Sequence, residues 1–287
     1  SLQAALKSLD GKDRAASRPP VLDFAPGRFD PVLSDSRLSA REVRKKLGFD
    51  PLGVKLSRKL HTDDPGKLNT DVREIAPPDK PVMVTKASSR RIISNELFGR
   101  RALRRWFGLY FDTPRSLAFD AGGESVMVME KVEGGPSHYD TRLDLPQRAA
   151  LALLVNTFGL GDMNAGNVLY TRAGGVSLID FEQALSRRQP NISRIPDESI
   201  AAEMPWLSRR RLNRAEDFFP AVAAWREIFL KPKTQQELAA MLRESGFAER
   251  DIPGILATFK ANVSDLEWTI QADVEFVNQF IPGNEEP

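Results

Sequence analysis

The chain of 287 residues contains no cysteine and only two histidines. The lack of cysteine excludes disulfides, a thiolate nucleophile and cysteine-rich zinc sites. His61 and His138 are too few and too isolated to form a histidine-based metal site. No run approaches eighteen consecutive apolar residues, so the sequence predicts a soluble protein that is not transmembrane.

Three polar residues with fixed separations stand near the middle of the chain. Asp162 and Asn167 are five residues apart, and Asp180 follows thirteen residues later. Between them lie two short apolar runs, 168–170 and 176–179, separated by a glycine-containing turn, a pattern typical of a β-hairpin. Phosphoryl transfer needs a carboxylate that orients the attacking hydroxyl and oxygen ligands that hold Mg²⁺ on the ATP phosphates. The alternative is a surface hairpin, whose turns favour Asp and Asn for backbone reasons alone.

The two motifs each resemble a branch of the kinase-like superfamily. Residues 159–167, Gly-Leu-Gly-Asp-Met-Asn-Ala-Gly-Asn, resemble the catalytic loop of the phosphoinositide 3- and 4-kinases and their protein-kinase relatives. Residues 178–182, Leu-Ile-Asp-Phe-Glu, resemble instead the choline and aminoglycoside phosphotransferases. The chain is diverged from both branches, because the histidine that usually accompanies the catalytic Asp is absent. The resemblance implies Asp162 as the base or hydroxyl-orienting residue, and Asn167 and Asp180 as metal ligands.

A kinase-like fold implies a lysine on an upstream strand and a glutamate on the next helix. Residues 82–86, Val-Met-Val-Thr-Lys, alternate as a strand does, and a helical pattern begins near Ser94. Lys86 would then contact the α- and β-phosphates of ATP and pair with Glu96. Because the chain is 28% charged, the alternative is that Lys86 is a solvated residue at a sheet edge.

A second strand pair is predicted over 116–119 and 125–129. The segment that follows resembles the hinge between the lobes of a kinase, where backbone groups of Glu130 to Val132 would contact the adenine edge. A structural turn is the competing interpretation. No Gly-x-Gly-x-x-Gly sequence precedes Lys86, so phosphate contacts would need a different loop.

Helical patterns dominate the second half of the chain. A helix over 145–158, capped by Asp144, would lead into the catalytic loop. Further helices are predicted over 216–230, 234–245 and 253–280. We expect their aromatic residues to lie in the core: Trp225, Phe229, Phe259, Trp268 and Phe276.

We therefore expect an α+β, protein-kinase-like two-lobe fold. Residues 1–75 would form a partly irregular N-terminal arm with one short basic helix over 40–47. Residues 76–133 would form the small sheet-containing N-lobe. Residues 134–287 would form the larger helical C-lobe with a helical C-terminal extension.

Arginines gather in two groups although the net charge is only +2. The first group comprises Arg90, Arg91, Arg100, Arg101, Arg104 and Arg105, and the second comprises Arg209, Arg210, Arg211 and Arg214. Such groups are usually solvated helix faces. The alternative is docking of an acidic ligand or partner, such as a phospholipid headgroup or an acidic protein surface. Nucleic acid is disfavoured, because no aromatic residues interleave with the arginines.

The predicted function is an ATP-dependent phosphotransferase that moves the γ-phosphoryl group to a hydroxyl acceptor, with ATP and Mg²⁺ as cofactors. A protein acceptor is slightly favoured over a lipid or a small molecule. A catalytically inactive kinase-like binding module and nucleotidyl transfer from the same site are the alternatives. A bacterial cytoplasmic protein and one delivered into a host cell both fit the sequence.

Overall fold

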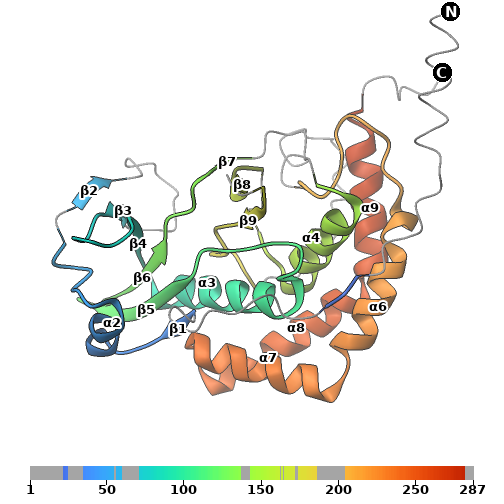
Figure 1. The fold of residues 1–287 in the computed structure, drawn as a ribbon. Helices are drawn as coiled ribbons and strands as arrows, with labels where there is room; N and C mark the ends of the chain where they lie inside the picture. Colours follow the sequence, from blue (N-terminus) through green and yellow to red (C-terminus); the bar gives the residue numbers. More distant parts are fainter. Residues whose placement is uncertain are drawn as a thin grey trace, which may run out of the picture.

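The computed structural model describes the ranges 22–24, 35–54, 56–59, 71–136, 143–161, 163, 165–171, 174–185 and 204–281. Within them the chain combines a six-stranded sheet, a three-stranded sheet and helices. The helices are α2 (Ala40–Leu47), α3 (Arg90–Ala102), α4 (Leu145–Phe158), α6 (Phe219–Phe229), α7 (Pro232–Ser245), α8 (Ile252–Ser264) and α9 (Leu266–Asn278). Figure 1 shows the large sheet at one end, most helices at the other and the small sheet between them. The fold is therefore mixed, with a sheet-containing part and a helical part.

The large sheet has the strand order β1-β5-β6-β4-β3-β2. Its strands are β1 (Ser36–Arg37), β2 (Leu56–Lys59), β3 (Asp71–Ile75), β4 (Met83–Ser88), β5 (Ser116–Ala121) and β6 (Glu124–Glu130). β1 pairs parallel with β5, and the other neighbouring strands are antiparallel. Gly122 and Gly123 join β5 to β6 with φ angles of +62° and +86°. Glycine adopts these angles at little cost, so the tight turn fixes the pairing.

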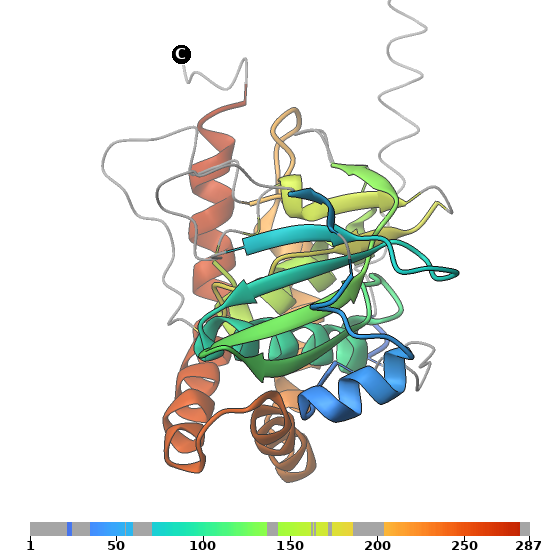
Figure 2. The same cartoon turned by 90° about the vertical axis from the view of Figure 1, so that its left-hand side faces the viewer.

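Two helices cover opposite faces of the large sheet, and strand alternation explains how. Successive side chains of a strand point to opposite faces. Met83 of β4 packs in one apolar cluster with Leu47 of α2. Its neighbour Val84 packs against another cluster that contains Leu97 of α3. In Figure 2 the sheet faces the viewer with α2 on its near side and helices behind it.

The small sheet lies between the large sheet and the helices. It consists of β7 (Gly134–Pro136), β8 (Val168–Thr171) and β9 (Val176–Leu178), in the order β7-β8-β9. Asp112, which precedes β5, extends it by an isolated bridge to Ser177. The N–H of Asp112 donates to the carbonyl oxygen of Val176 at 2.8 Å, and the N–H of Leu178 donates to that of Asp112 at 2.8 Å. The chain before β5 is thereby tied to the hairpin.

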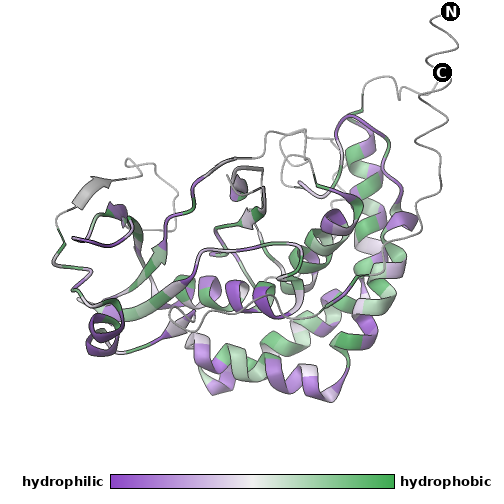
Figure 3. Cartoon of the chain, viewed as in Figure 1, coloured by the Kyte–Doolittle hydropathy of each residue, from purple (hydrophilic) through white to green (hydrophobic). Residues whose placement is uncertain are grey.

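Helix α4 is the centre of the helical part. Asp144 and Gln147 form a capping box at its start, and Gly159 ends it in a left-handed conformation with φ of 59°. Every residue from 149 to 158 is buried, and Figure 3 shows α4 coloured largely hydrophobic. Trp225 of α6 packs on Phe158 of α4 and donates its indole N–H to Thr157 at 2.8 Å. The helices therefore pack around an aromatic core.

Several helices and strands lie where the sequence pattern predicts them. α2 and α4 have the predicted bounds, 40–47 and 145–158. The helix predicted to begin near Ser94 begins instead at Arg90, because Ser89 caps it. The single helix predicted over 253–280 is two helices, α8 and α9, which meet at Asp265.

Two further expectations differ from the structure. β1, β2 and β3 all precede residue 76, so the large sheet begins within the range expected to form an irregular arm. β2 and β3, Leu-Ser-Arg-Lys and Asp-Val-Arg-Glu-Ile, are short and mostly polar, and so give little strand signal. Trp268 is 56% exposed and does not lie in the core.

Candidate functional site

Lys86 is surrounded by three carboxylates. Its Nζ lies 2.5 Å from Glu96 Oε1, 2.8 Å from Asp180 Oδ1 and 3.0 Å from Glu182 Oε2. The side chains of Lys86 and Glu96 are 7% and 0% exposed, so solvent hardly screens this pair. The alternative of a solvated lysine at a sheet edge is excluded, because β4 lies between β3 and β6.

Helix α3 positions Glu96 beside the sheet. Ser89 caps the helix by accepting from the N–H of Ile92, and seven residues later the Glu96 carboxylate faces β4. Arg100, one turn further on, donates from Nη2 to the second Glu96 oxygen at 3.1 Å. Arg100 itself is 1% exposed and also donates to Thr113 Oγ1 and to the carbonyl of Pro114. Glu96 is thus held between two cations.

The charges in the cluster shift three pKa values. Burial lowers the pKa of Lys86, but Glu96, Asp180 and Glu182 together outweigh burial and raise it above its ordinary value. Burial raises the pKa of Glu96, but Lys86 and Arg100 outweigh it and lower that pKa to about 2. Burial and the Glu96 carboxylate raise the pKa of Asp180 to about 7. At neutral pH Glu96 is therefore ionised, and the Asp180 carboxyl group is partly protonated.

Asp180 follows β9 and has a left-handed backbone, with φ of 66°. This conformation is uncommon outside glycine and is found preferentially at functional sites. Contacts of the next two residues with α3 maintain it. The N–H of Phe181 donates to the Glu96 carboxylate, and Asn95 Nδ2 donates to the carbonyl of Glu182 at 2.7 Å.

Asn167 lies at the same end of the β8–β9 hairpin as Asp180. It ends a short 3₁₀ turn, Ala165–Asn167, directly before β8. Its carbonyl accepts from the N–H of Ile179 at 3.0 Å, so the residue before Asp180 is paired with Asn167. Asn167 and Asp180, thirteen residues apart in sequence, therefore have their backbones at the same end of the hairpin, and their roles as metal ligands stay a prediction.

The predicted base, Asp162, lies outside the described residues, as does Asn164. The neighbouring Gly161 is described, and its N–H donates to the carbonyl of Gln183 at 2.5 Å. A Cβ at Gly161 would come within 2.8 Å of Gln183 Oε1, so the two segments are closely packed. The segment before Asp162 thus runs beside the segment that follows Asp180.

Glu130 and Val132 lie at the end of β6 and in the connection from β6 to β7. The Glu130 side chain does not point to the Lys86 face. It pairs with Met83 across the sheet and accepts from Arg115 Nε at 2.8 Å. The contact of this segment's backbone with adenine stays a prediction.

Glu182 is a member of the cluster that sequence reasoning missed. It occupies the place of the last glycine in the kinase sequence Asp-Phe-Gly. This glutamate in place of glycine is the sequence feature that could have indicated its role in the cluster. Glu96, Asp180 and Glu182 each offer an oxygen within 4.8 Å of the others, an arrangement that could hold a metal ion. Lys86 Nζ already lies within 3.0 Å of all three, so a cation would have to draw Asp180 away from it.

Four members of the first arginine group, Arg100, Arg101, Arg104 and Arg105, pair with carboxylates of the same chain. Arg101 pairs with Glu244, Arg104 with Asp35 and Arg105 with Glu237. Arg100 points inward to Glu96. These contacts leave no charge on the four arginines that would require an external acidic partner, and docking of such a partner stays a prediction. Glu237 and Glu244 lie on α7, far away in sequence, and so could not be foreseen.

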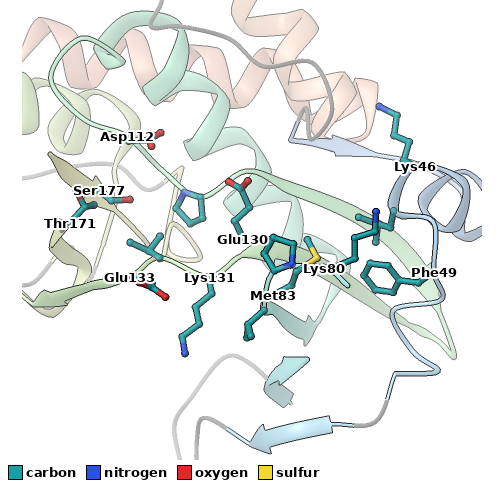
Figure 4. Close-up of a pocket in the computed structure, with 15 residues that line it drawn as sticks. Lys46, Phe49, Lys80, Met83, Asp112, Glu130, Lys131, Glu133, Thr171 and Ser177 are labelled. Atoms are coloured by element: carbon teal, nitrogen blue, oxygen red, sulfur yellow. The ribbon is translucent and has the colours of Figure 1, made fainter. Parts of the chain in front are cut away.

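A cavity of about 590 Å³ lies beside residues 130–133. Figure 4 shows it between Phe49 and Lys80 on one side and Thr171 and Ser177 on the other. Neither Lys86 nor Asp180 lines it. The cavity is therefore separate from the charged cluster.

Comparison with solved structures finds protein kinase domains. The kinase domain of Mycobacterium tuberculosis PknI is 17% identical, with 79% of this chain and 96% of that chain covered and a TM-score of 0.33. A C20A_R136A double mutant of that domain is 16% identical, with 79% and 94% covered and a TM-score of 0.32. Similarity this low carries no argument about activity.

No protein-family model matches the sequence, and neither does any curated protein. Among the described residues, no helix combines the length and apolar character needed to cross a membrane.

Proposed function

We propose that the chain is an ATP-dependent phosphotransferase that moves the γ-phosphoryl group of ATP to a hydroxyl acceptor. The observation that carries this proposal is the cluster in which Lys86 contacts Glu96 and Asp180, with Asn167 at the same hairpin end. We further propose a two-lobe division, with the large six-stranded sheet in one lobe and residues 134–287 in the other. A protein acceptor is slightly favoured over a lipid or a small molecule.

Lys86 would contact the α- and β-phosphates. Its pKa is raised by the surrounding carboxylates, so it carries a full positive charge at neutral pH. The Glu96 carboxylate holds the Lys86 ammonium group on the face of β4 that packs against α3. Arg100 in turn holds the Glu96 carboxylate by a hydrogen bond. When ATP binds, Lys86 can give up its contacts with Asp180 and Glu182 and contact phosphate oxygens instead. Its contact with Glu96 would remain.

Asp180 and Asn167 would hold Mg²⁺. A carboxylate and an amide offer the oxygen ligands that this ion prefers, and the β8–β9 pairing sets both residues at one end of the hairpin. When bound, the ion neutralises charge on the phosphates during transfer. Because the pKa of Asp180 is raised to about 7, its carboxyl must lose a proton before it can bind a cation well.

Asp162 would orient the acceptor hydroxyl and accept its proton. This role rests on its position five residues before Asn167. In the transfer, the hydroxyl oxygen bonds to the γ-phosphorus, the bond to the bridging oxygen breaks, and ADP leaves.

Two alternatives involve the same cluster. In a binding module without activity, Lys86 would stay paired with Glu96, Asp180 and Glu182, and no phosphoryl group would be transferred. In nucleotidyl transfer, the α-phosphorus is attacked and pyrophosphate leaves. The products distinguish them, since only phosphoryl transfer forms ADP in proportion to the phosphorylated acceptor.

The test is incubation of the full chain with γ-labelled and, separately, α-labelled ATP. Candidate acceptors are a lysate, a lipid extract and a panel of small alcohols. The proposal predicts that label from the γ-position enters an acceptor only with Mg²⁺, and that Asp180→Ala abolishes the transfer. Transfer of α-label with release of pyrophosphate would establish nucleotidyl transfer instead, and no transfer of either label would favour the binding module.

A further inference from the structure

The cavity lies on the face of the large sheet opposite to Lys86. Met83 lines the cavity, and alternation along β4 points Lys86 to the other face, where it meets Glu96 of α3. Lys46 and Leu47 at the end of α2 supply part of the wall. A ligand in this cavity would therefore not contact the charged cluster.

The walls of the cavity are mainly apolar, and its mouth is open. The apolar lining residues are Leu47, Phe49, Pro81, Val82, Met83, Pro114 and Val132. Val82, one of these residues, is 40% exposed. Small molecules in pockets are usually enclosed over most of their surface. An open groove with apolar walls instead suits an extended peptide whose side chains enter it.

The two ends of the groove carry opposite charges. Figure 4 shows Lys46 and Lys80 at the end near Phe49, and Asp112 at the end near Ser177. Lys80 forms no ion pair within the described ranges, while the charge of Lys46 interacts with that of Glu42 one helical turn earlier on α2. Asp112 is 79% exposed. A bound segment with an acidic side chain toward the lysines would match this distribution.

Ser177 gives a second, independent indication of a ligand. Val176 and Leu178 pack into the helical core, so Ser177 between them points the other way, into the groove. It is 2% exposed, and its Oγ has no hydrogen-bond partner among the described residues. A buried hydroxyl without a partner costs stability. A ligand group that bonds to Ser177 would remove that cost.

We propose that this groove binds an extended peptide segment of a protein partner. An acidic side chain of the peptide lies at Lys46 and Lys80, an apolar side chain packs against Phe49, and a polar group bonds to Ser177 Oγ. The binding needs no nucleotide, so it is independent of whether the protein transfers phosphate.

The test is selection from a random dodecapeptide phage library on the intact protein, followed by fluorescence polarisation with labelled copies of the enriched peptides. We expect an acidic residue beside bulky apolar ones. The double variant Lys46→Glu and Lys80→Glu should weaken binding about a hundredfold, because two attractive contacts become repulsive. Lys45→Glu is the control for the Lys46→Glu change alone, since it reverses one charge one residue away from the groove and should leave binding unchanged.

Ser177→Ala separates binding from a structural role. It removes a buried oxygen without a partner, so the unfolding midpoint should stay unchanged or rise, while peptide affinity falls about tenfold. The proposal is overturned if no peptide is enriched, or if the enriched peptides bind the double variant as well as the wild type. Binding of only a small apolar anion, such as anilinonaphthalene sulfonate, would likewise overturn it.

Discussion

Gly99 of α3 lies against Phe181 so closely that a Cβ at position 99 would come within 2.6 Å of the Phe181 Cβ and Cδ1 atoms. Phe181 is fully buried, and the Arg100 guanidinium lies 5.7 Å from the centre of its ring. The absence of a side chain at Gly99 therefore lets α3 approach the segment that carries Asp180. The close packing of Gly99 and Phe181 thereby allows Glu96 on α3 and Asp180 to reach Lys86 together.

Gly99→Ala should therefore separate α3 from the Asp180 segment. Overpacking of this kind costs about 1–3 kcal/mol, only partly offset by the higher helix propensity of alanine. Gly254→Ala is the matched control, because Gly254 also lies in a helix but has no atoms within 4 Å of the place that a Cβ would take. It should raise the free energy of unfolding by about 0.5–1 kcal/mol. Urea unfolding measures both, and equal stabilisation by the two changes would contradict the account.

Asp180→Asn should change the pH dependence of stability. The pKa of Asp180 is 3.8 in the absence of the fold and about 7 within it, so between these values the folded protein binds more protons. The contribution of Asp180 to the free energy of unfolding is therefore fully present below pH 4 and is lost as the pH rises through 7. Asparagine does not titrate, so the variant should gain stability relative to the wild type over that interval. The gain has an upper limit of about 1.4 kcal/mol per pH unit.

Glu249→Gln is the control for this measurement. Its hydrogen bond with Arg243 lowers the pKa of Glu249, so this group loses its contribution as the pH falls, in the opposite direction. Denaturant unfolding between pH 3 and pH 8 in EDTA would show both trends. A constant difference between Asp180→Asn and the wild type would show that the pKa of Asp180 is not raised.

Arg105→Glu should weaken the contact between α7 and the turn that follows α3. Arg105 Nε lies 3.0 Å from Glu237 Oε2, and Nη2 lies 3.3 Å from Oε1. Because both side chains are partly exposed, the loss should be about 0.5–1 kcal/mol. Adding Glu237→Arg restores the pair with its charges exchanged and should recover most of the loss. Thermal unfolding of the single and double variants tests this, and no recovery would mean that the pair contributes nothing.

Much of the helical structure could be predicted because its signals are local. Asp144 marks the start of α4, and the structure has a capping box there. The separation of Asn167 and Asp180 by a glycine-containing hairpin is likewise a short-range pattern.

Other features depend on contacts between distant segments. Glu182 contacts Lys86 across 96 residues of sequence, and Glu237 contacts Arg105 across 132. No local pattern distinguishes these carboxylates from solvated ones. The prediction that Trp268 is buried was wrong for the same reason, since helical spacing alone did not show which side of α9 the other helices would cover.

Asp162→Ala and Asp180→Ala should affect different steps. Loss of Asp162 removes the group that positions the acceptor, so turnover should fall about 10²–10⁴-fold while ATP affinity stays near wild type. Loss of Asp180 removes a metal ligand and should reduce nucleotide affinity and turnover together. Steady-state kinetics with varied ATP would separate the two. Full activity of Asp162→Ala would mean that the catalytic loop has been misplaced.

The most direct test of the central claim is calorimetric titration of the full chain with ATP, with and without Mg²⁺. If Asn167 and Asp180 hold the ion on the phosphates, the wild type should bind ATP weakly in EDTA and more tightly with Mg²⁺. Asp180→Asn should lose that difference. Equal affinity in both conditions, or no binding in either, would contradict the claim that this cluster is a nucleotide site.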